Sequence, residues 1–216
     1  MNKGHLTVKD AINKNGGIAI GILPQSKIKE IKEDKPFSYQ NYHLDKESLN
    51  DLFQTINICD GIILEGGIVI CDYEQEIARY CTEKDIPLLG ICCGCINMAL
   101  STGGSLSFDN YDYLKKEHFS LENMDMHKVK IDKDSKLFNL IDNEEFIVNS
   151  IHKCKIDNTG QYDVKGFSND GIVELLEMKN KGFNIGVQWH PELITEKNEQ
   201  NLIFKKFIEY IIKKNN

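Results

Sequence analysis

A cysteine between an apolar run and a helical segment is the first candidate for chemistry. Residues 86–91 are apolar, and they end at Cys92, which Cys93 and Gly94 follow. Residues 96–100 then have the character of a helix. A buried strand, a sharp turn with the nucleophile and a helix form the layout of a nucleophile elbow. The helix N-terminus favours a thiolate, because its dipole and N–H groups stabilise negative charge. Cys92 is therefore the predicted nucleophile.

The second candidate group lies far downstream, where residues 186–192 read Gly-Val-Gln-Trp-His-Pro-Glu. Histidine exchanges protons near neutral pH, which suits His190 to act as a base and then as an acid. Glu192 follows two residues later, and side chains at i and i+2 of an extended segment share a face. The carboxylate can therefore orient the imidazole, as in a catalytic triad. The predicted catalytic residues are Cys92, His190 and Glu192.

Both segments resemble those of a known family. Residues 90–94, Gly-Ile-Cys-Cys-Gly, are similar to the G-I-C-x-G elbow of class I glutamine amidotransferases and their γ-glutamyl hydrolase relatives. Residues 186–192 are similar to the same family's G-V-Q-x-H-P-E segment, in the same order. The resemblance covers most of the chain from Asn15 onward. It implies an α/β three-layer sandwich with a mostly parallel sheet, a nucleophile elbow and antiparallel strands added at one edge.

The resemblance implies a cysteine hydrolase that cleaves a γ-glutamyl amide, such as that of γ-glutamyl-γ-aminobutyrate, through a γ-glutamyl thioester on Cys92. An unreactive amide also needs an oxyanion site. The backbone N–H of Cys93 is one expected donor. The other is that of Gly67 in the Gly66-Gly67 turn, with Gly66 beside the substrate. Relatives carry an uncharged residue before this pair, whereas this chain has Glu65.

The resemblance also points to a substrate-binding segment. Residues 148–152, Val-Asn-Ser-Ile-His, are similar to the N-S-x-H segment of the hydrolase branch, so Ser150 and His152 are expected to contact the glutamyl group. Residues 170–174 resemble a D-G-x-x-E stretch and are interpreted as a structural turn and strand. One departure affects glutamine recognition, because Ile96 stands where the family places glutamine.

Three alternatives remain open at this stage. The chain could be a glutaminase subunit that delivers ammonia to a separate synthetase, although no synthetase domain is present and the N-S-x-H segment favours the hydrolase. It could be a non-catalytic relative that binds a ligand or partner, as the Ile96 and Glu65 departures suggest. Cys92 and Cys95 also form a C-x-x-C at a helix start, which is typical of redox proteins. That interpretation leaves the His-Pro-Glu segment unexplained.

Composition limits the class of protein. The 216 residues are 41% hydrophobic with a net charge of −7, which suits one domain over 1–216 and argues against nucleic-acid binding. No apolar segment approaches the ~20 residues of a membrane span, so no membrane association is expected. Seven cysteines without a secretion signal indicate a reduced, cytoplasmic protein. No cofactor and no metal site are expected, and a homodimer is left open.

The histidines outside the motifs have no partner spacing and are expected to face solvent (5, 43, 118 and 127).

The apolar pattern predicts strands that alternate with helices in the first half of the chain. Helices are expected at 8–13, 44–56, 72–84 and 195–213, and parallel strands at 18–23, 58–64 and 86–91. Residues 26–43 read as a loop. Short strands in antiparallel additions are expected at 129–131, 146–148, 162–164, 172–175 and 183–187.

The family's first apolar strand has no counterpart, since the chain enters its first helix at residue 8 almost at once. An interior strand without its neighbour leaves buried backbone groups unpaired, at ~1–3 kcal/mol each. We therefore expect that Met1 is not the natural start, or that the protein is a truncated and less stable version of an active relative. If the chain is natural, its sheet must close the gap by rearrangement.

Overall fold

The computed structural model describes residues 7–23, 38–40, 44–67 and 69–216. The helices are α1 (Val8–Lys14), α2 (Lys46–Ile56), α3 (Asp72–Lys84), α4 (Cys93–Ser101), α5 (Tyr111–Glu117), α6 (Lys136–Ile141) and α7 (Asn198–Asn215), with a 3₁₀ turn, η1 (Pro191–Ile194). The strands are β1 (Ser38–Gln40), β2 (Ile62–Leu64), β3 (Val69–Cys71), β4 (Leu88–Ile91), β5 (Ser105–Ser107), β6 (His127–Ile131), β7 (Glu145–Val148), β8 (Lys155–Asn158), β9 (Tyr162–Ser168), β10 (Val173–Met178) and β11 (Asn184–Val187).

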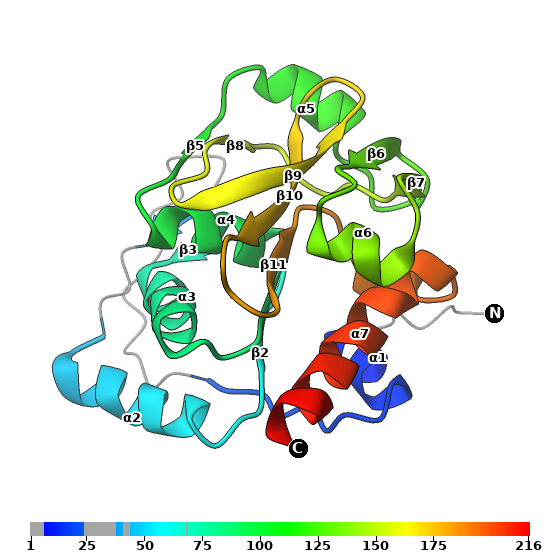
Figure 1. The fold of residues 1–216 in the computed structure, drawn as a ribbon. Coiled ribbons are helices and arrows are strands. Elements are labelled where there is room, and N and C mark those ends of the chain that lie inside the picture. The colour runs from blue at the N-terminus through cyan, green and yellow to red at the C-terminus, as the bar shows by residue number, and fades with distance from the viewer. Residues whose placement is uncertain (1–6, 24–37, 41–43, 68) are drawn as a thin grey trace.

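A mixed seven-stranded sheet forms the centre, in the order β2-β4-β11-β10-β9-β6-β7 (Figure 1). The β2–β4 and β4–β11 pairs are parallel, and the remaining four pairs are antiparallel. The α/β class predicted from the sequence is confirmed, whereas the sheet is mixed and not mostly parallel as expected. Two small sheets, parallel β1–β3 and antiparallel β5–β8, lie outside the central one.

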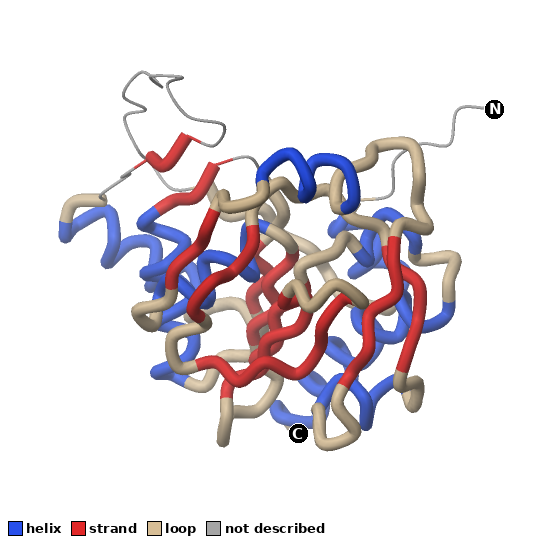
Figure 2. Tube along the Cα trace, turned by 90° about the horizontal axis from the view of Figure 1, so that it is seen from above, coloured by secondary structure: helices blue, strands red, loops and turns tan. Residues whose placement is uncertain are grey.

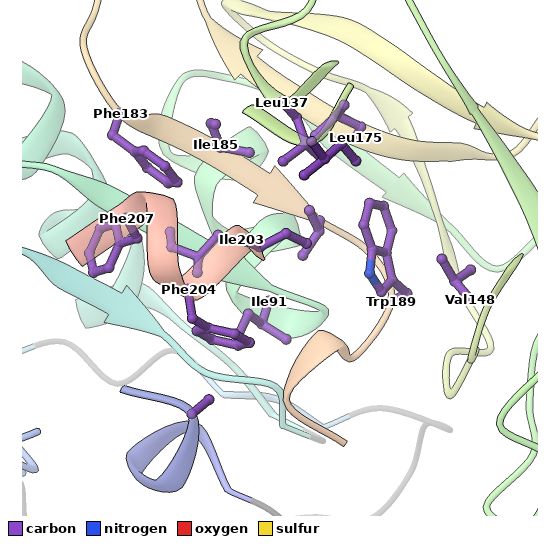
Figure 3. Packing of buried hydrophobic residues seen from close by; sticks show 14 of the residues in the cluster. Ile91, Leu137, Val148, Leu175, Phe183, Ile185, Trp189, Ile203, Phe204 and Phe207 are labelled. Atoms are coloured by element: carbon purple, nitrogen blue, oxygen red, sulfur yellow. The ribbon is translucent and has the colours of Figure 1, made fainter. Parts of the chain in front are cut away.

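Helices cover both faces of the parallel strands, which gives three layers (Figures 1 and 2). One core joins α1, α6 and α7 to the sheet, and Figure 3 shows Ile203, Phe204 and Phe207 of α7 in it. The other core packs α2, α3 and α4 against the opposite face. In β4, Leu89 and Ile91 belong to the first core and Leu88 to the second, as alternation along a strand requires.

Several predicted elements are confirmed with small changes of boundary. The helix expected at 72–84 is α3, and its Ile77, Ala78 and Cys81 are buried as predicted. The helices expected at 8–13, 44–56 and 195–213 are α1, α2 and α7. Thr7 caps α1 through a capping box with Asp10, a local signal that fixes the start of the helix.

The strand expected at 18–23 is wrong, because this segment forms no ladder. The side chains of Ile18, Ile20 and Leu23 are 88%, 69% and 89% exposed. Ala19 and Ile22 still pack on the two cores, so the segment follows the molecule without joining the sheet. An apolar run alone could not reveal this, since strand pairing depends on a partner far away in sequence.

Other corrections concern pairing. Residues 38–40, expected to be loop, form β1 and pair with β3, which was not predicted. The strand expected at 183–187 is β11, and it pairs parallel with β4 as well as antiparallel with β10, so it lies inside the sheet. The rest of the predicted loop lies outside the described residues. So do residues 1–6, and the expectation about the start of the chain stays a prediction.

No helix in the described part of the chain is both long enough and apolar enough to cross a membrane.

Gly94 provides a test of how α4 is seated on the sheet. A Cβ there would lie 2.1 Å from the carbonyl oxygen of Leu64 in β2. Because this oxygen belongs to the backbone, a side-chain rotation cannot remove the clash. We expect Gly94→Ala to lower the free energy of unfolding by about 3 kcal/mol, well beyond the ~1 kcal/mol that alanine gains in a helix. The measurement is urea denaturation.

Gly21→Ala is the matched control, because no heavy atom lies within 4 Å of a Cβ at that position. It should change the stability by less than about 0.5 kcal/mol. Equal effects of the two substitutions would contradict the close seating of α4 on β2.

Candidate active site

Three neighbouring parallel strands end at the same edge of the sheet. Gly90 of β4 is paired with Leu64 of β2 on one side and with Gly186 of β11 on the other. The residues just after these strands are therefore brought together: the Gly66 turn after β2, Cys92 after β4 and His190 after β11. The predicted catalytic residues from distant parts of the sequence thus meet at one edge.

Cys92 has the backbone of a strained turn, with φ 50° and ψ −104°. Non-glycine residues rarely occupy positive φ, and such strain concentrates at functional sites. Neighbouring backbone fixes the turn: the Cys92 N–H donates to the Val187 carbonyl at 2.8 Å, and the Ile96 N–H donates to the Cys92 carbonyl at 3.1 Å. The turn joins β4 directly to α4, as a nucleophile elbow does.

The sulfur of Cys92 lies in a closed environment. The residue is 5% exposed, and Gln188 Nε2 donates to its Sγ at 3.7 Å. Burial raises the pKa of the Cys92 thiol well above its usual value, and the charges of Cys93, Cys154 and Glu192 add to this, against a hydrogen bond from the Cys93 backbone. The expected preference for thiolate at the helix N-terminus is thus outweighed by desolvation, and Cys92 needs a base to ionise it.

His190 is held from two directions. Its Nδ1 lies 2.7 Å from Glu192 Oε1, and both side chains are about one-tenth exposed (12% and 10%). Asn149 fixes the backbone: its Oδ1 accepts from the His190 N–H and its Nδ2 donates to the His190 carbonyl, each at 2.8 Å. Because a carboxylate accepts at Nδ1, that nitrogen carries the hydrogen and Nε2 is left with its lone pair. Nε2 can therefore accept a proton.

Gly66 packs directly against the imidazole. A Cβ on Gly66 would lie 2.4 Å from Cε1 of His190, so only glycine leaves room for the ring. The glycine turn after β2 and the histidine after β11 therefore share one site. Among the described residues, the Cys92 sulfur is hydrogen-bonded to Gln188 and not to His190.

Acidic side chains border the site on the β2 side. Partial burial raises the pKa of Glu65, and the charge of Glu192 raises it further. Burial also raises the pKa of Glu74 to about 7, a hydrogen bond from Asn97 opposes this, and the Glu65 charge adds to it. The Asn97 side chain is fully buried on α4. The carboxylates of Glu65, Glu74 and Glu192 thus influence one another at this edge.

The remaining sequence-predicted positions lie in the interior. Ser150 is fully buried and donates to the His118 carbonyl at 2.8 Å, and the buried His152 lies 2.9 Å from the Cys154 carbonyl through Nδ1. Their role as substrate contacts stays a prediction. Ile96, at the family's glutamine position, is 2% exposed in the core beside α3.

The expectation that His118 and His127 face solvent is wrong. Their side chains are 2% and 12% exposed, and both approach the buried Glu174. His5 and His43 lie outside the described residues. Sequence reasoning also missed Asn149 and Gln188 as parts of the site. Both stand inside the motif segments, directly beside residues that were singled out, which was the available signal.

Comparison with known proteins agrees with this geometry. The family model described as Peptidase C26 matches residues 72–192. "Putative glutamine amidotransferase PB2B2.05" of Schizosaccharomyces pombe is 36% identical over 180 residues, which cover 69% of this chain and 68% of that protein. A CTP synthase of Streptococcus pyogenes is 28% identical over 188 residues, 73% of this chain but 35% of that longer protein.

The solved structures show the same fold. The glutaminase domain of Trypanosoma brucei CTPS with bound acivicin superimposes with a TM-score of 0.60 at 16% identity, over 79% of this chain and 80% of that chain. The fold and the site define a hydrolase domain of the glutamine amidotransferase type. The chain belongs to the Peptidase C26 family, within the class I glutamine amidotransferase-like proteins.

The raised pKa of Glu74 predicts how stability changes with pH. The folded protein binds the Glu74 proton more tightly than the unfolded chain, with a pKa of about 7 against 4.5. This contribution is complete below pH ~4.5 and is lost as the pH rises through 7. Glutamine resembles the protonated acid, so Glu74→Gln should be more stable than wild type by on the order of 3 kcal/mol at pH 8.

The two proteins should unfold almost equally at pH 4.5, as measured by urea denaturation at both pH values. Glu83→Gln, on the exposed side of α3, is the control and should show no such dependence. A Glu74→Gln advantage that is the same at both pH values would contradict the raised pKa of the partly buried Glu74.

Proposed function

We propose that this domain hydrolyses γ-glutamyl amides, with Cys92 as nucleophile, His190 as acid and base, and Glu192 orienting the imidazole. The observation that carries the proposal is the 2.7 Å His190–Glu192 pair placed after β11, the parallel neighbour of the strand that ends at Cys92. A buried thiol of raised pKa, at the same sheet edge as a histidine whose Nε2 can accept a proton, is suited to attack when a substrate is present.

The reaction follows from the roles of these groups. His190 Nε2 takes the Cys92 thiol proton while Sγ attacks the γ-carbonyl carbon. The backbone N–H groups of Cys93 and Gly67 stabilise the resulting oxyanion. His190 then gives its proton to the departing amine, which leaves a γ-glutamyl thioester. A water molecule deprotonated by His190 attacks the thioester, and glutamate and the free Cys92 thiol are released.

The acidic border favours a substrate with a positive charge. Glu65 supplies a carboxylate on the β2 side, where a γ-glutamyl compound would present its α-ammonium group or a cationic amine. Ile96 faces the core, so the glutamine contact made by the family residue at that position is absent. These two features support a γ-glutamyl amide other than glutamine as the substrate, consistent with the hydrolase branch suggested by the N-S-x-H segment.

A second candidate is a glutaminase that supplies ammonia to a separate synthetase. The specific observation in its favour is the similarity to CTP synthases, of which the chain matches about a third of the length. A panel of γ-glutamyl amides that includes glutamine separates the two, with products followed by mass spectrometry. The hydrolase predicts turnover of several amides and little of glutamine. Ammonia release from glutamine alone would favour the glutaminase, and no turnover of any member would favour a non-catalytic relative.

Cys92→Ala should abolish turnover of every active member of the panel without unfolding the protein. The lost atom is the one that forms the covalent bond, so at least a 10³-fold fall in kcat is expected. Cys59→Ala is the matched control, because this partly exposed thiol lies after α2, away from the sheet edge. Wild-type turnover in Cys92→Ala, or loss of activity in both variants, would contradict the assignment.

Glu192→Gln should lower kcat by about 10²-fold, less than Cys92→Ala, because Glu192 orients the imidazole and makes no bond to the substrate. The neutral amide no longer stabilises the imidazolium, so the pH profile of kcat should also change. Glu196→Gln, on the exposed side of the same segment, should keep the wild-type kcat and pH profile. An unchanged pH profile in Glu192→Gln would count against the orienting role.

A further inference from the structure

A second cluster of ionisable side chains lies away from the proposed catalytic residues. Glu174 of β10 is fully buried, and three histidines surround its Oε1. His118 Nδ1 lies 3.6 Å from this oxygen, His127 Nε2 3.1 Å and His152 Nε2 3.5 Å. The donor atoms of His118, His127 and Glu174 all lie within 4.8 Å of one another.

These atoms face one another without hydrogen bonds. Both oxygens of Glu174 lack a partner, and so do the facing nitrogens of the three histidines. Glu174 is a fully buried carboxyl group, and a buried carboxylate is costly unless a cation or full hydrogen bonding compensates it.

The outer hydrogen bonds of two histidines determine where their lone pairs point. His118 Nε2 lies 2.9 Å from Asp170 Oδ2, and a carboxylate oxygen accepts, so Nε2 carries the hydrogen. His152 Nδ1 lies 2.9 Å from the Cys154 carbonyl, which only accepts, so Nδ1 carries the hydrogen. For neutral rings, His118 Nδ1 and His152 Nε2 then direct lone pairs at Glu174. Lone pairs facing a carboxylate repel it unless a cation lies between them.

The distances suit a metal ion. Two ligand atoms at about 2.0–2.1 Å from a tetrahedral ion stand about 3.3 Å apart. The three nitrogen–oxygen distances of 3.1–3.6 Å lie around this value and, for His118 and His152, exceed a normal hydrogen bond. We propose that His118, His127 and Glu174 form a binding site for a divalent transition-metal ion, with His152 beside Glu174 and with Zn²⁺ as the first choice for imidazoles and one carboxylate.

The second layer of contacts matches that of metal centres. Metal-binding histidines usually donate their other N–H to a carboxylate or a backbone carbonyl, which fixes the tautomer. Asp170 does this for His118 and is itself held by Ser168 and by Tyr113, whose hydroxyl donates at 2.9 Å. The charges also balance, since a dipositive ion offsets the two carboxylates of Glu174 and Asp170.

The site is almost fully enclosed by protein, which suits a structural role for the ion. His118 follows α5, His127 begins β6, His152 lies between β7 and β8, and Glu174 lies in β10. The ion would join the segments that carry His118, His127 and Glu174, and of these three side chains His127, at 12% exposure, is the one that reaches solvent. Glu174 also connects the cluster to the catalytic strand, because its backbone carbonyl accepts from the Gln188 N–H at 2.9 Å.

The test measures the metal content of the full chain purified without chelators and then loaded with Zn²⁺. Elemental analysis should find one zinc per wild-type chain, and thermal stability should rise with zinc concentration, because only the folded state holds the ligands together. His127→Gln should lose the stoichiometric zinc. Asp170→Asn should bind zinc 10–100-fold more weakly in competition with a chelating dye, as expected for loss of a supporting carboxylate.

Controls separate this site from the thiols of the elbow. Cys92→Ala should retain one zinc, and the cobalt-substituted protein should show no thiolate-to-metal charge-transfer band. Circular dichroism establishes whether each variant is folded. If His127→Gln does not fold, the zinc affinity of Asp170→Asn provides the test. Absence of stoichiometric zinc in the loaded wild type would overturn the proposal in favour of a cluster held together by protons. Equal zinc affinity in wild type and Asp170→Asn, or a thiolate band, would overturn it as well.

Discussion

The parallel register of β2, β4 and β11 is the constraint on which the rest of the site depends. Gly90 lies between Leu64 and Gly186, so the three chains leave the sheet at the same level. Gly66, Cys92 and His190 would no longer lie together if one strand shifted by a residue, since such a shift moves every side chain of that strand to the opposite face of the sheet. Glycine on β11 also lets α4 pack closely on these strands, because a Cβ at Gly186 would lie 2.9 Å from the sulfur of Cys95 in α4.

Burial determines the electrostatics that this geometry produces. At Cys92, desolvation outweighs the stabilisation of a thiolate by the helix N-terminus and keeps the thiol protonated at rest. Desolvation also raises the pKa of Glu74 to about 7. In β10, the carboxylate of Glu174 is buried, and the imidazoles of three histidines surround it. The fold thus encloses two groups of titratable residues on adjacent strands, one suited to proton transfer and the other to holding a cation.

The sequence predicted the α/β class, α3, α4 and the separation between the elbow and the His-Pro-Glu segment, because each depends on local pattern or on a short motif. It failed where the outcome depended on distant partners. The apolar residues 18–23 form no ladder, and β1 and β3 pair with each other. His118 and His127 have no regular spacing. The sheet order β10-β9-β6 brings His127 to Glu174, and His118 reaches it from the end of α5. The raised pKa of Glu74 could not be predicted from the sequence either, because it arises from partial burial beside α4.

The central claim is that Cys92 becomes covalently bonded to a γ-glutamyl group. The most direct measurement is peptide mapping by mass spectrometry after the protein reacts with a γ-glutamyl anilide and is quenched in acid within a single turnover. The account predicts a γ-glutamyl adduct on the peptide that contains residues 90–95, located on Cys92 by fragmentation and removed by hydroxylamine, as a thioester should be. An adduct on a different cysteine, or substrate turnover without any adduct, would contradict it.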